Sequence, residues 1–345
     1  MSKCYIIAEA GVNHNGSDEL ALQLVEAAAK SGADAVKFQT FKTENLVSQE
    51  AKTAEYQKLQ TGEDSQFNML KKLEISEELH IKLIDQCKQS GIEFLSTPFD
   101  AESAKFLLDL GMKKIKVSSG ELTNIPFIKE LANYDMPMIV STGMSTLAEI
   151  KDAVEAIQNA REIKQFKRPL SEMLTILHCT SNYPAKYKDI NLRAIQTIEN
   201  EFNIPVGYSD HTEGVFVSVS AVVMGATIVE KHFTLDKDMP GPDHQASLDP
   251  EELKEMVDQI RSIEWCLGDG IKAPTKSELP VRELVRRSVV LVLDKKAGEV
   301  LKLSDLSLLR PGNGIAPIDI EKIVGMKLLS DCKSNTTIQW SDLVQ

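Results

Sequence analysis

The stretch SGADAVKFQ, from Ser31 to Gln39, sets the pattern that decides the fold of this chain. Its glycine stands where a helix must end and the chain must turn back, and a short apolar run that ends on a polar residue follows. The same order returns in SGIEFLST, LGMKKIKVSS and MGATIVEKH. Helix, glycine turn and buried strand therefore form a unit that repeats along the chain.

Apolar runs of this kind recur, and segments with helical periodicity separate them. The runs are Tyr5–Glu9, Ala35–Gln39, Glu93–Thr97, Lys114–Ser119, Met138–Thr142, Thr175–Thr180, Val206–His211 and Thr227–His232. Runs that are apolar throughout are typical of parallel strands, which are covered on both faces. Eight such strands alternating with helices predict a (β/α)8 barrel, the TIM barrel, whose active site lies at the carboxyl ends of the strands.

Side chains of the kinds that enzymes use gather at these predicted strand ends. They are Glu9, Lys37, Gln39, Thr97, Lys116, Ser119, Ser209, His211, Glu230 and His232. Because the strand ends of a barrel meet at one face, we expect these side chains to share one site. The sequence therefore predicts an enzyme with its active site in the barrel mouth.

Two segments depart from the repeating unit. Residues 40–75 form a long connection rich in Lys, Glu, Gln and Thr, which predicts a functional lid or an interface arm. Residues 271–283 carry turn formers and predict a linker between the barrel, residues 1–270, and a small second domain, residues 284–345. The core of that domain is small, so we expect it to lean on the barrel or on another subunit.

Composition and charge exclude several classes of function. The 345 residues are 42% hydrophobic and carry a net charge of -12, which permits a large core and argues against non-specific nucleic-acid binding. Five cysteines, odd in number and without CxxC spacing, indicate a reducing compartment. The start, MSKCYIIAEAG, is not expected to be a signal peptide, and no apolar run reaches the roughly 20 residues of a membrane helix. We therefore expect a soluble, cytoplasmic protein that binds neither nucleic acid nor membrane.

Two histidines at the ends of the last two predicted strands are the sharpest candidate pair. Barrel closure makes the strand ends of His211 and His232 neighbours, so both imidazoles can converge on one ion. Two neutral imidazoles with open positions beside them suit a divalent cation that acts as a Lewis acid. Asp210 and Glu230 flank the pair as further ligands or as partners that orient the rings. By contrast, His80 lies on a polar helix face and is expected at the surface.

Two lysines within predicted strands, Lys37 and Lys116, allow three interpretations. A lysine is costly to bury without a charge partner, so both are expected to face the barrel mouth. They can form structural ion pairs, bind phosphate or carboxylate with nearby hydroxyl groups, or, for Lys116, form a Schiff base. Two acids near the same face, Glu9 and Glu121, are candidates for a general base or a charge partner.

The motifs of the chain, taken in order, resemble the sialic acid synthase family. They read IIAEAGVNHNG, AVKFQTF, STPFD, KVSSGE, STGM, HCTSNYP, GYSDHTEG, IVEKHFT, GPDH and RPGNGI. The resemblance covers nearly the whole chain and implies a TIM barrel followed by a small antifreeze-like (SAF) domain. It implies an enzyme that condenses phosphoenolpyruvate with an N-acetylated mannosamine-type sugar. It also implies a homodimer in which the small domain covers the partner's barrel mouth.

The resemblance further implies a role for each candidate residue. His211 and His232 would hold the metal, Mn²⁺ by preference, with Mg²⁺ or Co²⁺ as alternatives. The catalytic residues would be Glu9, Glu121 and Lys116. The substrate-binding residues would be Lys37, Gln39, Thr97, Ser119, Ser181, Tyr183, Ser209, Asp243 and, from the partner subunit, Arg310.

Three acceptor sugars compete within this interpretation. N-acetylmannosamine is the first choice, which would make the enzyme an N-acetylneuraminate synthase; its 6-phosphate would call for an additional basic cluster at the mouth. The 2,4-diacetamido-2,4,6-trideoxy sugars that give legionaminic or pseudaminic acid lack the 6-hydroxyl and would favour apolar residues there. Two rival functions remain: a Schiff-base pyruvate aldolase that uses Lys116, and a sugar-binding module without activity.

Overall fold

The computed structural model describes residues 3–53, 58 and 62–345. The chain divides into two compact units, Met1–Asp269 and Gly270–Gln345. No described helix is long and apolar enough to span a lipid bilayer.

The first unit is built on a sheet of eight parallel strands. The strands are β1 (Tyr5–Gly11), β2 (Ala35–Thr40), β3 (Glu93–Pro98), β4 (Ile115–Val117), β5 (Met138–Ser141), β6 (Leu174–Cys179), β7 (Val206–Asp210) and β8 (Ile228–His232). Their order in the sheet is β3-β2-β1-β8-β7-β6-β5-β4, and β3 also lies beside β4. The sheet thus curls into a nearly closed barrel, which confirms the predicted fold.

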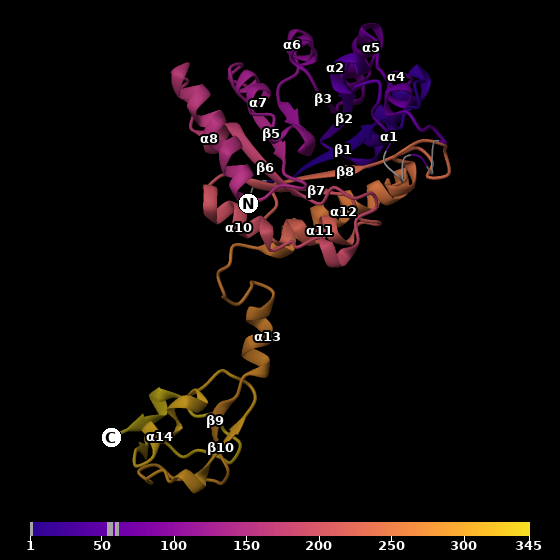
Figure 1. The fold of residues 1–345 in the computed structure, drawn as a ribbon. Helices are drawn as coiled ribbons and strands as arrows, with labels where there is room; N and C mark the ends of the chain where they lie inside the picture. The colour runs from indigo at the N-terminus through magenta and orange to yellow at the C-terminus, as the bar shows by residue number, and fades with distance from the viewer. Residues whose placement is uncertain (1–2, 54–57, 59–61) are drawn as a thin grey trace. The chain divides into compact units, whose positions relative to one another are not determined.

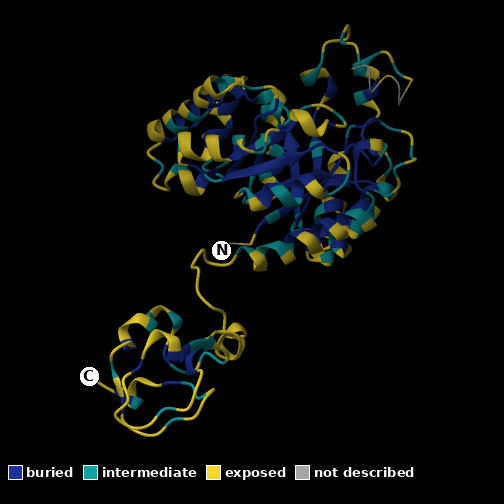
Figure 2. Cartoon of the chain, turned by 90° about the horizontal axis from the view of Figure 1, so that it is seen from below, coloured by how far each residue is buried: buried dark blue, intermediate teal, exposed yellow. Residues whose placement is uncertain are grey.

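Helices surround the strands on the outside of the barrel (Figure 1). The longer ones are α1 (Asp18–Ser31), α5 (Glu77–Ser90), α6 (Ala101–Asp109), α7 (Ile125–Ala132), α8 (Leu147–Ile163), α10 (Ala194–Phe202), α11 (Phe216–Val223) and α12 (Pro250–Leu267). A one-turn helix, α9 (Leu170–Met173), leads directly into β6. Figure 2 shows the strands buried and the outward faces of the helices exposed, as expected when helices cover a parallel sheet.

The stretch that set the predicted pattern folds as expected. Helix α1 begins after Ser17, whose hydroxyl accepts a hydrogen bond from the backbone N–H of Leu20, 3.3 Å away. It ends at Gly32, whose φ of 84° is the left-handed conformation that glycine adopts without strain. Strand β2 follows at once and pairs with β1 from Ala35 onward. Local sequence therefore fixes where this helix stops and where the strand begins.

Side chains at the ends of β7 and β8 alternate between the barrel interior and the surrounding helices. Ser209, Glu230 and His232 line an interior cavity. Asp210 instead faces the helices: its carboxylate accepts a hydrogen bond from Ser218 of α11, 2.6 Å away, and pairs with Lys231 at 3.0 Å. Contrary to the prediction, Asp210 therefore does not point at the histidines, because strand alternation places it on the other face.

The long connection between β2 and α5 folds back onto the barrel. It contains the short helices α2 (Thr43–Leu46) and α4 (Gln66–Lys71). A small hydrophobic cluster apart from the two large barrel cores anchors them; its buried members are Val12, Phe41, Met69 and Leu73. Part of the prediction for residues 40–75 concerns residues 54–57 and 59–61, which lie outside the described residues. The described part covers one side of the barrel mouth.

His80 of α5 is buried, and its predicted surface position is wrong. Only 1% of this residue is exposed. One ring nitrogen lies 2.8 Å from the Thr40 hydroxyl and the other lies 2.8 Å from the Ser76 carbonyl oxygen. The ring also packs edge-on against Phe106. Two hydrogen-bond partners let a polar ring occupy an otherwise apolar position on the inner face of the helix.

His14, in the turn after β1, predicts a pH dependence of stability. Its ring is 1% exposed, and one nitrogen accepts a hydrogen bond from the backbone N–H of Gly16 at 3.0 Å. The other nitrogen is buried without a partner among the described residues. Burial lowers the pKa of His14 to about 4. Between pH 6.5 and 4 the unfolded chain therefore binds a proton that the folded protein does not, so stability falls as the pH falls.

We expect His14→Asn to remove about 3 kcal/mol of this acid sensitivity, because asparagine keeps an acceptor for Gly16 and does not titrate. The measurement is urea unfolding of both proteins at pH 4.5, 5.5 and 7. A residual slope of the same sign is expected from His244, whose pKa burial also lowers to about 4. Identical slopes for the two proteins would contradict the assignment.

The second unit is a small β-rich domain. It contains α13 (Glu278–Val285), the antiparallel pairs β9 (Ser288–Leu291) with β10 (Leu306–Leu309) and β11 (Lys327–Leu328) with β12 (Leu343–Val344), and the single turn α14 (Ile320–Ile323). Its buried core includes Val289, Leu301, Ile315 and Ile338. Helix α13 runs across the predicted boundary between linker and second domain, because Glu278–Val285 forms regular helical turns where the sequence showed only turn formers.

Candidate active site

A cavity of about 530 Å³ lies at the carboxyl ends of the barrel strands. Most of the predicted site residues line it. They are Glu9, Lys37, Gln39, Thr97, Lys116, Ser119, Ser181, Tyr183, Ser209, His211, His232 and Asp243. The barrel therefore brings together in space the residues that the sequence placed at separate strand ends.

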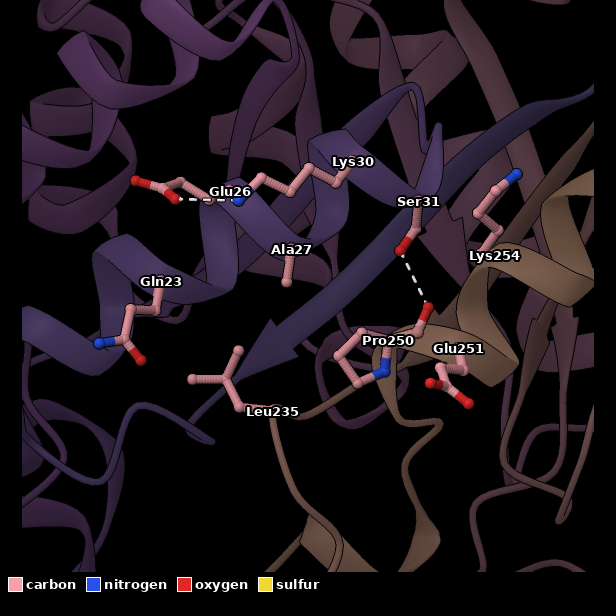
Figure 3. Close-up of a pocket in the computed structure, with 9 residues that line it drawn as sticks. All are labelled: Gln23, Glu26, Ala27, Lys30, Ser31, Leu235, Pro250, Glu251 and Lys254. Carbon is pink, nitrogen blue, oxygen red and sulfur yellow. Dashed lines mark hydrogen bonds and ion pairs between the residues drawn. The ribbon is translucent and has the colours of Figure 1, made fainter.

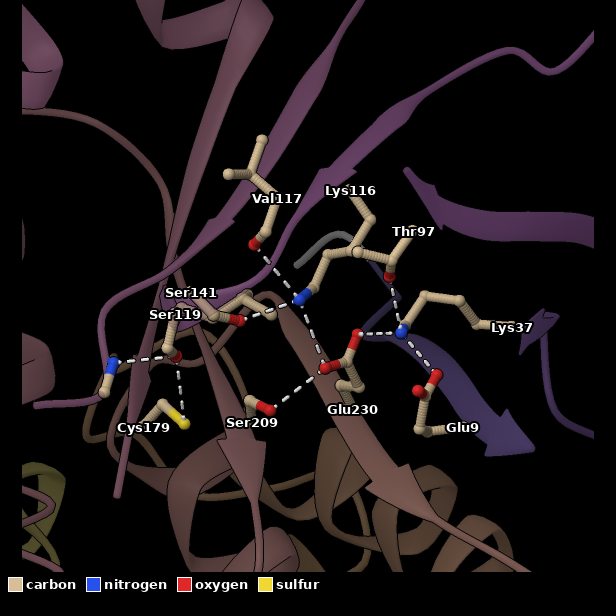
Figure 4. Close-up of polar contacts among 12 residues, drawn as sticks. Glu9, Lys37, Thr97, Lys116, Val117, Ser119, Ser141, Cys179, Ser209 and Glu230 are labelled. Atoms are coloured by element: carbon tan, nitrogen blue, oxygen red, sulfur yellow. Dashed lines mark hydrogen bonds and ion pairs between the residues drawn. The ribbon is translucent and has the colours of Figure 1, made fainter. Parts of the chain in front are cut away.

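The floor of the cavity is a chain of four buried charges of alternating sign (Figure 4). Lys37 forms an ion pair with Glu9, donates to the Thr97 hydroxyl at 2.9 Å and lies 3.8 Å from Glu230. Glu230 in turn lies 3.3 Å from the Lys116 ammonium group. With both acids ionised, the two acids and two lysines sum to zero charge, so each buried charge lies beside one of opposite sign.

Two neighbouring hydroxyl groups complete this network. Ser209 donates to Glu230 at 3.0 Å, and Lys116 donates to Ser141 at 2.8 Å. Sequence reasoning left Ser141 out; it placed Glu230 at the strand ends but gave it a role only beside the histidines, as a further ligand or an orienting partner. Glu230 carries a usable signal, because it stands two positions before His232 and a strand places such residues on the same face.

Burial and charge shift the ionisation of these groups in different directions. Burial raises the pKa of Glu9, although Lys37 opposes the shift. Burial acts in the same sense on Glu230, but Lys116 and Lys37 outweigh it and hold its pKa at about 2. Burial also lowers the pKa of Lys116. Burial acts in the same sense on Lys37, but the charges of Glu230 and Glu9 outweigh it and raise the pKa. Of the two acids, Glu9 therefore holds a proton more readily than Glu230.

A second part of the cavity presents hydroxyl and backbone N–H groups. The Ser119 hydroxyl accepts a hydrogen bond from the backbone N–H of Gly143 at 2.9 Å and lies 3.7 Å from the Cys179 sulfur. A side chain at Gly143 would stand only 2.0 Å from the Ser181 hydroxyl, so glycine is required for this close approach. Neutral donors arranged in this way suit an anionic oxygen.

The two histidines face each other across the cavity. Their ring centres are 5.4 Å apart, and Tyr183 packs against both rings. One His211 nitrogen lies 2.7 Å from the Thr180 carbonyl oxygen, which makes it the donor and leaves the other nitrogen with its lone pair. A buried His232 nitrogen has no hydrogen-bond partner among the described residues, and the Asp243 carboxylate lies 3.9 Å from it. This donor set fits a divalent cation.

The pKa shifts of the two rings agree only in part with a metal site, which needs both rings in the neutral form. Burial and the neighbouring charge of His211 lower the pKa of His232, which keeps this ring neutral. Burial opposes protonation of His211 as well, but the Cys179 thiolate outweighs it and raises the pKa of that ring. Among the described residues, no three His, Cys, Asp or Glu side chains form a complete cage. An ion held here would therefore share its coordination with water or substrate.

Two predicted site residues lie apart from the cavity floor. Glu121 does not line the cavity, and its carboxylate accepts a hydrogen bond from the side chain of Asn124 at 2.8 Å. Arg310 belongs to the second unit and is exposed there. The catalytic role of Glu121 and the sugar contact of Arg310 stay predictions.

Another depression lies outside the barrel, between α1 and the start of α12 (Figure 3). There Ser31 donates to the Pro250 carbonyl oxygen at 3.1 Å, and Lys30 pairs with Glu26 at 3.4 Å. Its lining includes none of the predicted site residues. The strand-end cavity is therefore the stronger candidate for catalysis.

A nearly closed barrel with buried acids, lysines and histidines converging at its strand ends defines a TIM-barrel enzyme. The model of the NeuB family matches residues 24–272, and that of the SAF domain matches residues 286–344. The chain belongs to the NeuB family of sialic acid synthases. The resemblance drawn from the motifs, and the small domain that it implies, are thereby confirmed.

Three known proteins illustrate this membership. The N,N'-diacetyllegionaminic acid synthase of Legionella pneumophila is 52% identical over 99% of this chain and 94% of its own length. The enzyme of the same name from Campylobacter jejuni is 46% identical over 98% of this chain and all of its own length. The solved structure of a sialic acid synthetase from Leptospira borgpetersenii superimposes with a TM-score of 0.70 at 32% identity, covering 81% of this chain and 90% of that one.

Proposed function

We propose that this enzyme is an N,N'-diacetyllegionaminate synthase, which condenses phosphoenolpyruvate with 2,4-diacetamido-2,4,6-trideoxymannose. The observation that carries the proposal is the identity of 52% and 46% to two enzymes of that name over nearly the whole chain. Identity to the sialic acid synthetase of known structure is only 32%. This ranking reverses the order of acceptors inferred from the sequence, where N-acetylmannosamine came first.

The proposed reaction uses the polar groups of the cavity in separate roles. Carbon 3 of phosphoenolpyruvate attacks the sugar aldehyde, water adds at carbon 2, and phosphate leaves by C–O cleavage. Lys37 and Lys116 offset the charge of the phosphate and carboxylate groups, and Ser119 and Ser181 position their oxygens. Glu9, whose pKa burial raises, holds or releases the proton that the aldehyde oxygen and the water exchange.

A divalent cation is part of the proposal. His211 and His232 would hold it, with Mn²⁺ as the first choice and Mg²⁺ or Co²⁺ as alternatives. When bound, the ion supplies Lewis-acid polarisation of the sugar aldehyde. The support is the facing pair of rings and the unpartnered His232 nitrogen.

The test is phosphate release from phosphoenolpyruvate with each of two acceptors, the diacetamido sugar and N-acetylmannosamine. We expect release with both, a higher kcat/KM for the diacetamido sugar, complete loss in EDTA and recovery with added Mn²⁺. Phosphoenolpyruvate labelled with ¹⁸O in its C–O–P bridge should yield labelled phosphate. A preference for N-acetylmannosamine would overturn the acceptor assignment, and full activity in EDTA would overturn the metal.

Two rival functions have distinct outcomes in the same assay. A Schiff-base aldolase would work in EDTA, and borohydride with pyruvate would attach a three-carbon adduct to Lys116. A sugar-binding module would release no phosphate with any acceptor. Burial lowers the pKa of Lys116 and outweighs Glu230, which favours the charged form, so the borohydride test decides between the two functions.

The assembly and location of the enzyme stay part of the proposal. We propose a cytoplasmic homodimer in which the SAF domain brings Arg310 of the partner subunit to the acceptor. Sedimentation of the purified protein tests the dimer. Mixing an Arg310→Ala variant with a His232→Ala variant tests the sharing of sites, because only a dimer that exchanges this domain regains part of its activity.

A further inference from the structure

One side of the active-site cavity is mostly apolar, in contrast to its floor, with Gln66 of α4 as a polar neighbour. Val12 follows β1, Met69, Leu70 and Leu73 come from the connection after β2, and Phe99 follows β3. These five residues are the apolar wall. Because β1, β2 and β3 are neighbours in the sheet, the wall stands over three adjacent strand ends.

The apolar wall is a packed structure. Val12, Met69 and Leu73 are buried in one hydrophobic cluster, and Leu70 and Phe99 pack against it while staying partly exposed. Helix α4 begins after Ser65, whose hydroxyl accepts a hydrogen bond from the backbone N–H of Asn68 at 3.3 Å. Two partly exposed apolar side chains on a fixed support offer a surface that water wets poorly.

Two lysines beside the apolar wall, Lys71 and Lys72, are paired with acids. Lys71 of α4 lies 2.9 Å from Glu44 and 3.1 Å from Glu74, and Lys72 lies 3.3 Å from Glu63. Neither lysine lines the cavity. Within the described barrel unit, the lysines that do line it are the two on the floor, both beside Glu230. This side of the cavity is therefore poorly suited to a phosphorylated sugar.

The positions of the polar groups decide which end of the acceptor meets the apolar wall. The serine side, with Ser119 and Ser181, follows β4 and β6, and the histidines end β7 and β8. An aldehyde held beside the histidines, with phosphate on the serine side, leaves the side of β1 to β3 for the rest of the sugar. The far end of an open-chain acceptor, its carbon 6, then lies against Leu70 and Phe99.

We propose that the apolar wall receives the carbon-6 methyl group of a 6-deoxy acceptor and sets the preference for such sugars over those with a hydroxyl or phosphate there. The inference rests on the proposed condensation and deepens it. A 6-hydroxyl placed against Leu70 and Phe99 would lose water and gain no hydrogen bond from these two side chains, which costs binding free energy.

The experiment compares two acceptors that differ only at carbon 6: 2-acetamido-2,6-dideoxymannose and N-acetylmannosamine. We expect the unaltered enzyme to favour the 6-deoxy sugar by about 10-fold to 100-fold in kcat/KM, the range that one such group provides in an apolar pocket. Leu70→Gln offers the hydroxyl a partner and should lower this ratio about 10-fold. The KM for phosphoenolpyruvate should change little, because Leu70 belongs to the connection after β2, whereas Ser119 and Ser181 follow β4 and β6.

Matched variants separate the apolar wall from a general loss of structure. Asn68→Ala changes an exposed residue of the same helix and should leave the ratio as it is. Leu70→Met keeps the surface apolar and should do the same. Phe99→Tyr adds a hydroxyl group at the second partly exposed position of the wall. It replaces Leu70→Gln as the test variant if that protein does not fold, and it should lower the same ratio.

The outcomes distinguish this inference from the proposed function. An unaltered enzyme without a 6-deoxy preference, or a ratio that neither Leu70→Gln nor Phe99→Tyr lowers, would overturn the inference. If these variants lower kcat/KM equally for both sugars, the inference is also overturned, because the wall would then have only a structural role. A further outcome is that the diacetamido sugar fails as a substrate while Leu70→Gln still lowers the ratio of kcat/KM between the two test sugars. That result would overturn only the acceptor in the proposed function.

Discussion

His232→Ala is expected to lower kcat by about 10³-fold or more and to abolish tight Mn²⁺ binding. The reason is the proposed donor set, in which the two neighbouring imidazoles would be the protein's nitrogen ligands and one of them is then lost. Loss of Lewis-acid assistance worth several kcal/mol corresponds to a change of this size. Electron paramagnetic resonance of free Mn²⁺ measures binding in the absence of substrate, and phosphate release measures turnover.

A histidine in the neighbouring strand provides the control. His178 of β6 hydrogen-bonds the Ile190 carbonyl oxygen, 2.7 Å away, and does not line the cavity. His178→Asn should therefore bind Mn²⁺ as the unaltered enzyme does. His211→Ala should behave like His232→Ala. Normal Mn²⁺ affinity in either alanine variant would remove the metal from this pair and, with it, the polarisation of the aldehyde.

Lys231→Met is expected to lower the free energy of unfolding by about 3–5 kcal/mol, the usual cost of breaking a buried ion pair by removing one partner. Both side chains of the pair are fully buried. The Lys231 ammonium group donates to Asp210 at 3.0 Å and to the Thr212 carbonyl oxygen at 2.5 Å. Without it, the Asp210 carboxylate stays in the protein interior with hydrogen bonds from Thr212 and Ser218 but without its ion-pair partner. Urea unfolding at pH 7 provides the measurement.

Two further variants establish that the pair causes the effect. The double variant Asp210→Asn with Lys231→Met should lose at least about 1 kcal/mol less than the sum of the single losses, because neither charge is then left alone. Lys254 and Asp258 form an ion pair of 2.7 Å on the surface of α12, so Lys254→Met should change stability by less than about 1 kcal/mol. Additive losses in the double variant would show that the two charges act independently.

The barrel could be predicted because local sequence carries its signals. Glycine ends α1 at Gly32, and strand β2 follows directly as an apolar run. Helix α13 was missed because Glu278–Val285 is short, contains Pro280 and follows a run of turn formers, and none of it is buried. His80 was misplaced because its partners, Thr40 and Ser76, are brought to it by the fold and not by spacing along the chain.

In the site, too, residues at strand ends could be predicted from the sequence, whereas contacts that only the folded chain creates could not. Lys37 and His232 were predicted from strand ends, where the position in a barrel is enough to bring residues together. Which carboxylate accompanies which lysine depends on register between strands, so Glu230 was undervalued. The apolar wall could not be foreseen, because Leu70 reaches the mouth only when a long connection folds back over it. That connection has no periodic pattern long enough to predict its path.

The segment that carries Leu70 is stabilised by a cluster of its own, separate from the two cores that hold the barrel together. Substitutions there alter a local patch of packing and leave the strands with their acids, lysines and histidines in register. If the apolar wall selects the acceptor as proposed, changes in this connection alter the acceptor while the bond-forming chemistry stays fixed. Related barrels could in this way make different nine-carbon sugars by varying one long connection.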